Sequence, residues 1–455
     1  MPNIASRRTV FLLIFIVAFA LRLLNLAATD FSADALLIED AKFYWADATS
    51  GQGFLNTVKS IFLGQTERVP GYFIFVSAIV SLFGKYFLPV LVIQSALDSL
   101  TCLMIMALGR RVFPENYWGF GLIAAVWPNL IIHSGLILTD TLFTFMFTWF
   151  LLSFVWLLET KKLKHALLVG VLLGIATLVR PVTQFIIVLS PLLAPFMLIS
   201  VKTSLRRAII NSLTIFLIAV ACLTPLAIKN SYSYGSIALT SQNGNHLQNW
   251  VVSEVIMLRD GISRNEAVAK LSAKTDQQML SLPIESQTNP FVRSAYQSKT
   301  ALAELVDTPP SVVIKSWLQG AIINLASPAV MIDTRFRALP HLSFAEDTTG
   351  SLSTRMKQFI AGSSTTYVSI LLVGIGGSLI VSLMQFGGFF VQLRATPTLA
   401  SLAFLTVACF LLINGPTASP KYRLPLEPIL IVWLGCALSY CHGLTKKWLY
   451  RRALS

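Results

Sequence analysis

Residues 9–28 of the chain are TVFLLIFIVAFALRLLNLAA, an apolar run that sets the fold class for the rest of the sequence. About 20 apolar residues in a helix are enough to cross the hydrocarbon core of a bilayer. The 455-residue chain is 55% hydrophobic and only 12% charged, and its mean hydropathy is +0.69. These values are typical of a polytopic membrane protein and do not fit a soluble enzyme of this length.

Nine more apolar runs follow the first, so we expect an all-α membrane protein with about ten transmembrane helices. The first run is longer than the apolar core of a signal peptide and is followed by further spans, so we interpret it as a retained anchor. The ten predicted spans are 9–28, 88–109, 118–138, 141–158, 166–180, 182–201, 208–228, 367–391, 398–414 and 428–442.

The spans divide the chain into three parts. Residues 1–228 form an N-terminal membrane module whose first outer loop is 29–87, residues 229–366 form a larger polar loop, and residues 367–455 hold the last helices and a short tail. Within the loops, the 14 apolar residues 71–84 are too few to span and indicate an interfacial or re-entrant helix. Residues 311–330 mix apolar and polar side chains in a pattern that predicts an amphipathic helix on the membrane surface.

The net charge of +14 suggests nucleic-acid binding until it is sorted by topology. The segments predicted to be cytoplasmic hold 15 basic residues against two acidic ones, Glu115 and Glu159. The positive-inside rule predicts this excess and places both termini in the cytoplasm. The charge therefore reflects membrane orientation, and no nucleic-acid partner is expected.

A charged cluster lies directly after the first span, where ionisable groups next to apolar helices often mark a functional site. If residues 39–47 are helical, Asp40, Tyr44 and Asp47 share one face, while Glu39 and Lys42 form a pair three residues apart. Acidic residues at the start of a helix are also favoured by its dipole alone. A capped surface helix is therefore the alternative to a reaction centre.

The same first loop ends on the segment Arg68-Val-Pro-Gly-Tyr72. A guanidinium at this place suits a bidentate phosphate contact. The alternative is an arginine that extends to a lipid headgroup, and for Arg22 in the first span we favour that alternative. Asp98 lies deeper, inside the second span, and there needs a partner that we expect to be a structural hydrogen bond.

Further charged residues fall at the outer ends of later spans. Asp140 begins the fourth span, where helix capping is the alternative to a role in a site. One outer rim is thus expected to collect the cations Lys42, Arg68, Arg180, Lys229, Lys421 and Arg423 with the acids Glu39, Asp40 and Asp140. A basic rim facing carboxylates at one depth suits an anionic lipid head together with a general base.

Metal and nucleotide signatures are weak in this sequence. The five histidines show no HxxxH or HxH spacing; a divalent metal held by His246 and a loop carboxylate stays an open alternative, and we assign no metal ligand. No Walker motif or nucleotide-binding glycine pattern appears, so a nucleotide-driven pump is not expected.

The order of these segments resembles the GT-C superfamily of polyprenyl-phosphate-sugar glycosyltransferases, which includes protein O-mannosyltransferases and lipid A aminoarabinose transferases. Six short motifs, each weak alone, occur in the family's order. They are Glu39-Asp40-Ala41-Lys42 with Tyr44, Arg68-Val69-Pro70-Gly71-Tyr72, Ser134 to Asp140, Leu178-Val179-Arg180-Pro181, Thr224-Pro225 with Lys229-Asn230, and Lys421-Tyr422-Arg423-Leu424-Pro425.

The resemblance implies an inverting sugar transfer at the periplasmic face, with a first-loop carboxylate as general base. Relatives often have the two acids in the opposite order, so either Asp40 or Glu39 could be the base, and we choose Asp40 with Glu39 in support. Lys42 matches a position where relatives hold phosphate with an arginine. No sizeable C-terminal soluble domain is expected, so acceptor recognition would fall to residues 229–366.

We therefore expect a hexosyl- or pentosyltransferase in the bacterial inner membrane that moves a monosaccharide from a polyprenyl-phosphate donor to a glycan, lipid or protein. The donor, the acceptor and the bilayer are its expected partners. Residues expected to line the sugar and phosphate site are Lys42, Tyr44, Arg68, Tyr72, Asp140, Arg180, Lys229, Lys421 and Arg423. The alternatives are a multi-span transporter or lipid flippase, and a non-catalytic envelope scaffold.

Overall fold

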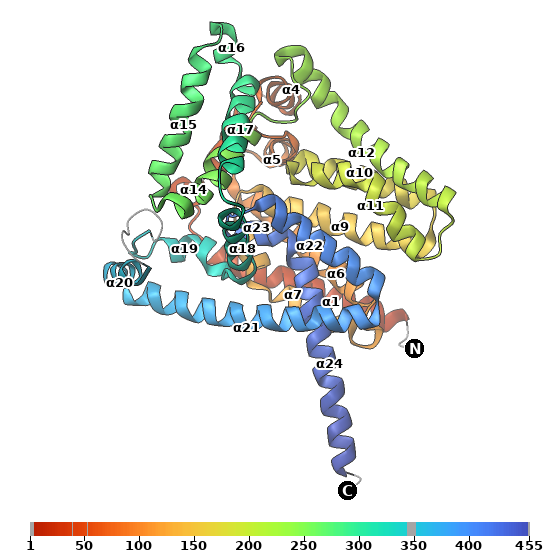
Figure 1. Cartoon of the computed structure of the whole chain (residues 1–455). Coiled ribbons are helices and arrows are strands. Elements are labelled where there is room, and N and C mark those ends of the chain that lie inside the picture. Colours follow the sequence, from red (N-terminus) through yellow and green to blue (C-terminus); the bar gives the residue numbers. More distant parts are fainter. Residues whose placement is uncertain (1–3, 39, 52, 344–351, 454–455) are drawn as a thin grey trace.

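The computed structural model describes residues 4–38, 40–51, 53–343 and 352–453, and every regular element in these ranges is helical (Figure 1). Eight helices are long and apolar enough to cross a membrane. They are α1 (Ile4–Ala27), α6 (Phe87–Gly109), α9 (Thr139–Thr160), α11 (Gln184–Ser200), α12 (Leu205–Tyr234), α21 (Thr365–Ala395), α22 (Pro397–Asn414) and α24 (Glu427–Ala453). The predicted all-α polytopic fold is confirmed.

Two of the ten predicted spans are not among these eight helices, and each lies next to a proline. The run at 118–138 is divided into α7 (Tyr117–Ala125) and α8 (Pro128–Ser134), with an extended backbone at Trp127. The run at 166–180 forms the 17-residue α10 (Leu163–Val179), which ends where Arg180 takes an extended conformation before Pro181. Proline lacks an amide hydrogen and disfavours a helical conformation in the residue before it.

Helix α9 lies at the centre of the membrane part. It packs between α6 and α10, and α10 packs in turn on α12. Phe143 and Phe147 of α9 are fully buried and meet Phe410 of α22 in the main hydrophobic core. By contrast, α21 lies at the periphery with few of its residues buried, as expected for a helix that faces lipid. It touches α24 closely, because a Cβ on Gly388 would fall 1.7 Å from a carbonyl oxygen of α24.

A buried ion pair joins the first two long helices. Arg22 of α1 is fully buried, and its Nε lies 2.5 Å from Oδ2 of Asp98 in α6. Its Nη1 also donates to the carbonyl of Ala125 in α7, at 3.1 Å. The expectation that Arg22 extends to a headgroup is wrong, because its guanidinium neutralises the acid inside the helix bundle. Asp98 has the structural partner that its depth required.

Four helices form the first outer segment, namely α2 (Ala33–Leu36), α3 (Ala41–Thr49), α4 (Phe54–Gly64) and α5 (Gly71–Phe83). Helix α5 covers the apolar stretch predicted at 71–84 and packs against α3, α4, α6 and α10. Its inward side chains include Tyr72 and Phe73, both fully buried. This contact places the start of α5 over the outer ends of the membrane helices.

The larger outer segment is a helical insert with a small core of its own. After α12 it runs through α13 (Gln242–His246), a π-helical turn (Leu247–Val252), α14 (Ser253–Asp260), α15 (Arg264–Leu280), α16 (Ile284–Thr288) and α17 (Pro290–Val306). The core joins Val252 and Ile256 to Leu271 of α15 and Ala301 of α17. In Figure 1, α15 and α16 stand away from the apolar helices, whereas α17 contacts α12, with the ring centroids of Phe291 and Tyr234 5.3 Å apart.

The chain then returns to the bundle through α18 (Pro310–Ala326), α19 (Thr334–Arg337) and α20 (Leu352–Gly362), and a later turn forms α23 (Pro420–Arg423). Helix α18 covers the predicted amphipathic segment, and its polar face is the inner one. Ser316, Gly320 and Asn324 are buried, whereas Ile314 and Leu318 are exposed. Apolar side chains that point outward suit contact with lipid.

Candidate active site

The first half of the site is an ion pair between α3 and the turn before α5. Asp40 stands at the N-terminal end of α3, yet its side chain makes no capping hydrogen bond. Its Oδ1 instead accepts from Arg68 Nη2 at 2.8 Å. The guanidinium side chain is 9% exposed, so Arg68 is held inside the protein. The capping and headgroup alternatives for these two residues are therefore wrong, and Glu39, the other candidate base, lies outside the described residues.

A dense set of hydrogen bonds sets the position of Arg68. The side-chain oxygen of Gln65 accepts from the backbone N–H groups of Glu67 and Arg68, at 2.9 and 3.3 Å. The side-chain amide of Gln65 donates to Asp47 of α3 at 2.8 Å. The carbonyl of Gln65 accepts from Lys229 Nζ at 3.1 Å. Lys229, which we expected at the phosphate, thus hydrogen-bonds the backbone of the turn that carries Arg68.

Tyr44 and Tyr72 line the interior next to this pair. Their rings meet edge to face with centroids 5.0 Å apart. The Tyr72 hydroxyl donates to Gln94 Oε1 at 2.7 Å, and Gln94 Nε2 donates to the carbonyl of Leu136 at 2.8 Å. Gln94 is fully buried in α6 and so ties the start of α5 to the loop that leads into α9.

The second half of the site is the ion pair of Asp140 with Arg180. Asp140 lies in the first turn of α9, and its Oδ1 accepts from Arg180 Nη1. The backbone of Arg180 is extended because a proline follows it, so the Arg180 side chain lies beyond the end of α10. The guanidinium carbon lies 5.9 Å from the ring centre of Phe143 and 5.8 Å from that of Tyr422.

More nitrogen-bearing side chains surround this second pair. His133 of α8 and Lys421 of α23 are the next nearest cationic or imidazole groups to the Asp140 carboxylate. His246 of the insert meets the Tyr422 ring at 6.5 Å. Burial, followed by the charges of Arg180 and Lys421, lowers the pKa of His246 to about 4. The arrangement forms a basic pocket around a single carboxylate.

Tyr44 connects the two halves. Burial raises the pKa of its hydroxyl well above the ordinary value, and the charged groups that act on it are Asp40, Arg68, Arg180 and Asp140. One buried phenol is therefore flanked by both ion pairs, which come from segments far apart in the chain. A carboxylate at one side and a cationic cluster at the other can accept a proton and hold an anion within one site.

Two predicted residues lie apart from this arrangement. Lys42 is exposed on α3, with Nζ 5.2 Å from the ring centre of Phe43. Arg423 is 4% exposed and is bound by protein groups, since its Nη2 donates to Gln385 at 3.3 Å and its Nε lies 2.9 Å from Glu427. We therefore place Arg423 as a structural residue, contrary to the expectation of a headgroup contact.

Three side chains of the site were missed as site residues by the sequence reasoning. His246 was considered only as a metal ligand, His133 only as a neighbour of Asp140, and Gln94 not at all. A buried glutamine in an apolar helix is a signal that could have been used, because such an amide needs partners. Over the described ranges, no group of three or more His, Cys, Asp or Glu side chains is placed to hold a metal ion.

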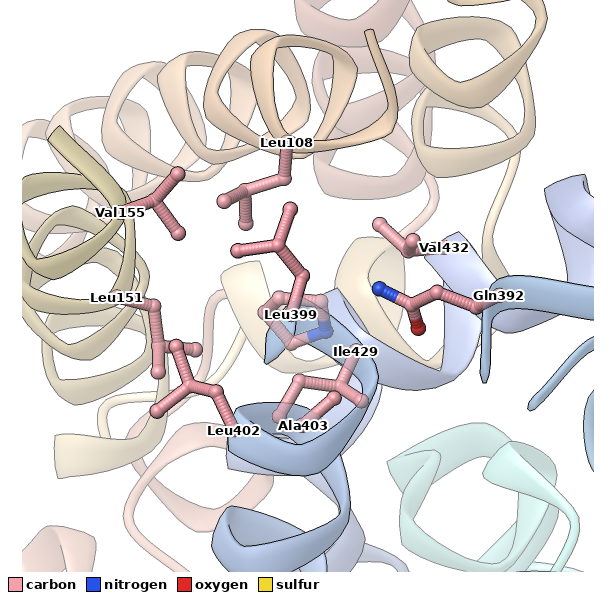
Figure 2. A pocket seen from close by; sticks show the side chains of 10 residues that line it. Leu108, Leu151, Val155, Gln392, Leu399, Leu402, Ala403, Ile429 and Val432 are labelled. Carbon is pink, nitrogen blue, oxygen red and sulfur yellow. The ribbon is translucent and has the colours of Figure 1, made fainter. Parts of the chain in front are cut away.

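A cavity of about 50 Å³ lies elsewhere in the bundle, among α6, α9, α21, α22 and α24 (Figure 2). Its wall is apolar except for Gln392, so it offers no titratable group for chemistry. A second apolar cavity, of about 80 Å³, lies among α9, α10, α11, α12 and α22 and is lined by residues such as Phe150, Ile186 and Met197. The helices that line it include α9, which carries Asp140, and α11, which begins four residues after Arg180.

Comparison with known proteins gives a consistent family. Residues 67–228, less than half of the chain, match the family model described as dolichyl-phosphate-mannose-protein mannosyltransferase. That range includes Arg68, Tyr72, Asp140 and Arg180 and ends before the insert. A search of curated protein sequences finds no match.

Solved structures resemble the whole chain. The oligosaccharyltransferase of Archaeoglobus fulgidus with a tethered acceptor peptide gives a TM-score of 0.55 at 14% identity, covering 100% of this chain and 51% of that one. The same archaeal protein, AglB, in complex with an inhibitory peptide and a dolichol-phosphate gives 0.52 at 13% identity, covering 98% and 51%. This chain therefore spans about half the length of those proteins.

ArnT from Cupriavidus metallidurans bound to undecaprenyl phosphate is also similar, at 12% identity over 96% of this chain and 78% of that one. Its TM-score of 0.40 is too low to establish a shared fold. The archaeal structures show that this chain shares the fold of the Archaeoglobus fulgidus oligosaccharyltransferase over its described length, and the family model matches residues 67–228 of it.

Proposed function

We propose that the chain transfers a monosaccharide from a polyprenyl-phosphate donor to an acceptor hydroxyl by one inverting displacement. The observation that carries this proposal is the pair of ion pairs on either side of Tyr44. One half, Asp40 with Arg68, offers a carboxylate that is 40% exposed and so reachable from outside the bundle. The other half, Arg180 with Lys421 nearby, offers the positive charge that a lipid phosphate requires.

In the proposed reaction Asp40 removes the proton from the acceptor hydroxyl, and that oxygen attacks the anomeric carbon of the donor sugar. The bond between the anomeric carbon and the phosphate oxygen breaks, and its electron pair leaves with the phosphate. Polyprenyl phosphate and the glycosylated acceptor are the products. A single displacement needs one base and no covalent intermediate, and Asp40 is the carboxylate of this half that we assign to that role.

The leaving phosphate gains negative charge as the bond breaks, so cations fixed in place before the reaction stabilise the transition state. Arg180 is suited to this role because its planar guanidinium binds two phosphate oxygens at once. Lys421 would add a second positive charge, and exposed Lys42 a third at the edge of the site. Arg68 would hold the Asp40 carboxylate in position, with its Nη2 2.8 Å from Oδ1.

The isoprenoid chain of the donor would lie in the apolar cavity that begins along α11. Ile186 and Met197 of α11 face Phe150 of α9 across this space, and Arg180 stands just before α11. A lipid phosphate bound by Arg180 would therefore have an apolar path for its tail. The description of the archaeal neighbour as a complex with dolichol-phosphate supports a donor of this class.

The insert between α12 and α18 is the part best placed to select the acceptor. Its contact with the first loop is direct, since the Ser241 backbone N–H donates to the carbonyl of Thr66 at 2.8 Å. We place this insert and the site on the periplasmic side of a bacterial inner membrane, in agreement with the basic residues expected on the opposite side. The acceptor is then a periplasmic glycan, lipid or protein that carries a hydroxyl group.

The test uses the purified full-length protein with a panel of radiolabelled undecaprenyl-phosphate monosaccharides and envelope extract as acceptor. The proposal expects one donor to lose its label to an acceptor, with free undecaprenyl phosphate released in equal amount. Vesicles containing the same lipids serve as the comparison for a flippase. Movement of intact donor across the vesicle membrane, with no release of undecaprenyl phosphate from any donor, would reject the transferase in favour of a transporter.

A further inference from the structure

His246 is the one described side chain of the insert that reaches the basic pocket next to Asp140. It is the last residue of α13, immediately before the π-helical turn at Leu247–Val252. Its ring stands at 78° to the Tyr422 ring, with centroids 6.5 Å apart. The charges that act on it are those of Arg180 and Lys421. The imidazole is therefore placed beside both cations assigned to the phosphate.

The backbone around His246 is held on its first side by α17. The N–H of Gly244 donates to Ser294 Oγ at 2.9 Å. The approach of the two chains is so close that a Cβ on Gly244 would fall 2.0 Å from the carbonyl oxygen of Ser294. Only glycine fits at this contact, so α17 fixes the segment that carries His246.

The other side is held by the turn that carries Lys421. The carbonyl of Trp250, in the π-helical turn, accepts from Thr417 Oγ1 at 3.0 Å. The carbonyl of Thr417 accepts in turn from the buried amide of Asn324 in α18, at 2.9 Å. Single π-helical turns inside helices occur frequently at functional sites. The insert is thus hydrogen-bonded to the turn that carries Lys421.

The imidazole has unused hydrogen-bonding capacity. Among the residues that the structure describes, none hydrogen-bonds the His246 ring, although the side chain is partly buried. With a pKa near 4 the ring is neutral at physiological pH, and it then carries one N–H donor and one acceptor nitrogen. Polar groups left without a partner inside a site are commonly completed by a ligand.

We infer that His246 donates its ring N–H to an oxygen of the phosphate group bound between Arg180 and Lys421. The inference deepens the proposed function and rests on it. An N–H bonded to a phosphate oxygen is a charge-assisted hydrogen bond, stronger than a neutral one. The negative charge of the phosphate also offsets the two cations that disfavour a positive imidazole. The insert would in this way contact the donor directly, because His246 is one of its residues.

The test measures binding of farnesyl phosphate, a short polyprenyl phosphate, to the full-length protein in detergent, with inorganic phosphate in parallel. Replacing the ring by an aromatic group without a donor, His246→Phe, should weaken farnesyl phosphate binding about 10- to 100-fold, the value of a hydrogen bond to a charged group. His246→Gln keeps an N–H donor and should retain most of the affinity. A matched control is His341→Phe, because His341 stacks on Tyr367 at 4.3 Å outside the pocket and phenylalanine preserves that stacking.

A second variant keeps the test decisive if the histidine replacement fails to fold. Gly244→Ala must push the segment away from α17 and should weaken binding in the same direction while leaving the ring present. Equal loss for inorganic phosphate and farnesyl phosphate would show that the contact is to the phosphate itself, as inferred. Farnesyl phosphate affinity unchanged in both His246→Phe and Gly244→Ala would overturn the inference and leave the transferase intact. Failure of the wild-type protein to bind farnesyl phosphate would instead reject the donor class.

Discussion

Replacing Asp40 with asparagine should separate catalysis from folding. The carboxamide has nearly the same shape and still offers an oxygen to Arg68, but it cannot take a proton from an acceptor hydroxyl. Removing a positioned general base costs about 100- to 10,000-fold in rate, equivalent to about 3–5 kcal/mol of activation free energy. We expect the sugar-transfer rate constant to fall by this amount.

The stability of the same variant should change little. The Asp40 side chain is 40% exposed, so solvent screens its attraction to Arg68. Ion pairs with an exposed partner contribute about 1 kcal/mol or less. The free energy of unfolding in detergent should therefore fall by no more than that value. Loss of activity would then report on chemistry and not on the fold.

The assay follows release of free undecaprenyl phosphate from a labelled donor, with thermal unfolding recorded on the same samples. Asp34→Asn is the matched control, because Asp34 is an exposed acid of the same outer segment, on α2. It should have wild-type turnover. Near-normal turnover in Asp40→Asn, with Asp34→Asn unchanged, would remove Asp40 from the mechanism and leave Glu39 as the candidate base.

Three further predictions concern stability. Arg22→Ala leaves the Asp98 carboxylate buried without its partner and should lower the free energy of unfolding by about 3–5 kcal/mol, and the double variant Arg22→Met with Asp98→Leu should recover most of the loss. Gly388→Ala should destabilise the contact of α21 with α24 by about 1–3 kcal/mol, whereas Gly387→Ala, whose Cβ meets no atom within 4 Å, should not; equal melting points would refute the close approach. The pKa of His246 is about 4 in the folded protein, against an ordinary value of 6.5. As the pH falls from 6.5 to 4, His246 therefore takes up a proton in the unfolded chain but not in the folded one, and the free energy of unfolding declines over this range. His246→Gln should remove up to about 3 kcal/mol of that acid sensitivity, measured as the difference in unfolding free energy between neutral pH and pH near 4.

The hydrophobic pattern predicted most of the membrane architecture, because apolar runs of bilayer length have few other stable conformations. The two departures were local and both followed from proline. Pro128 divides one run into α7 and α8, and Pro181 limits α10 to 17 residues, fewer than a full span. Hydropathy averages over about 20 residues, so a single missing amide hydrogen does not register in it.

The sequence predicted which residues belong to the site, but it did not predict which of them form ion pairs. Asp40 and Arg68 lie 28 residues apart, and Asp140 and Arg180 lie 40 apart. Each residue alone had a local alternative, such as capping or contact with a headgroup, that sequence spacing could not exclude. Only packing of α3 against α5, and of α9 against α10, brings the opposite charges together.

The insert was the least predictable part of the site. Its helices carry ordinary polar sequence, and His246 ends α13, just before a π-helical turn whose geometry has no recognised composition. The close contact at Gly244 with α17 depends on a segment 50 residues further along the chain. Lys229 was expected at the ligand and instead braces Gln65, because the outer end of α12 lies behind the turn that carries Arg68.

The buried guanidinium of α1 has a consequence for biogenesis. An arginine among the apolar residues of α1 is costly in hydrocarbon, and its neutralising acid is made 76 residues later. We therefore expect the nascent first helix to stay beside the insertion machinery until α6 has emerged, so that the two enter the lipid together. Shortening the nascent chain to end before Asp98 should leave the first helix poorly integrated, whereas a chain that ends after α6 should be fully embedded.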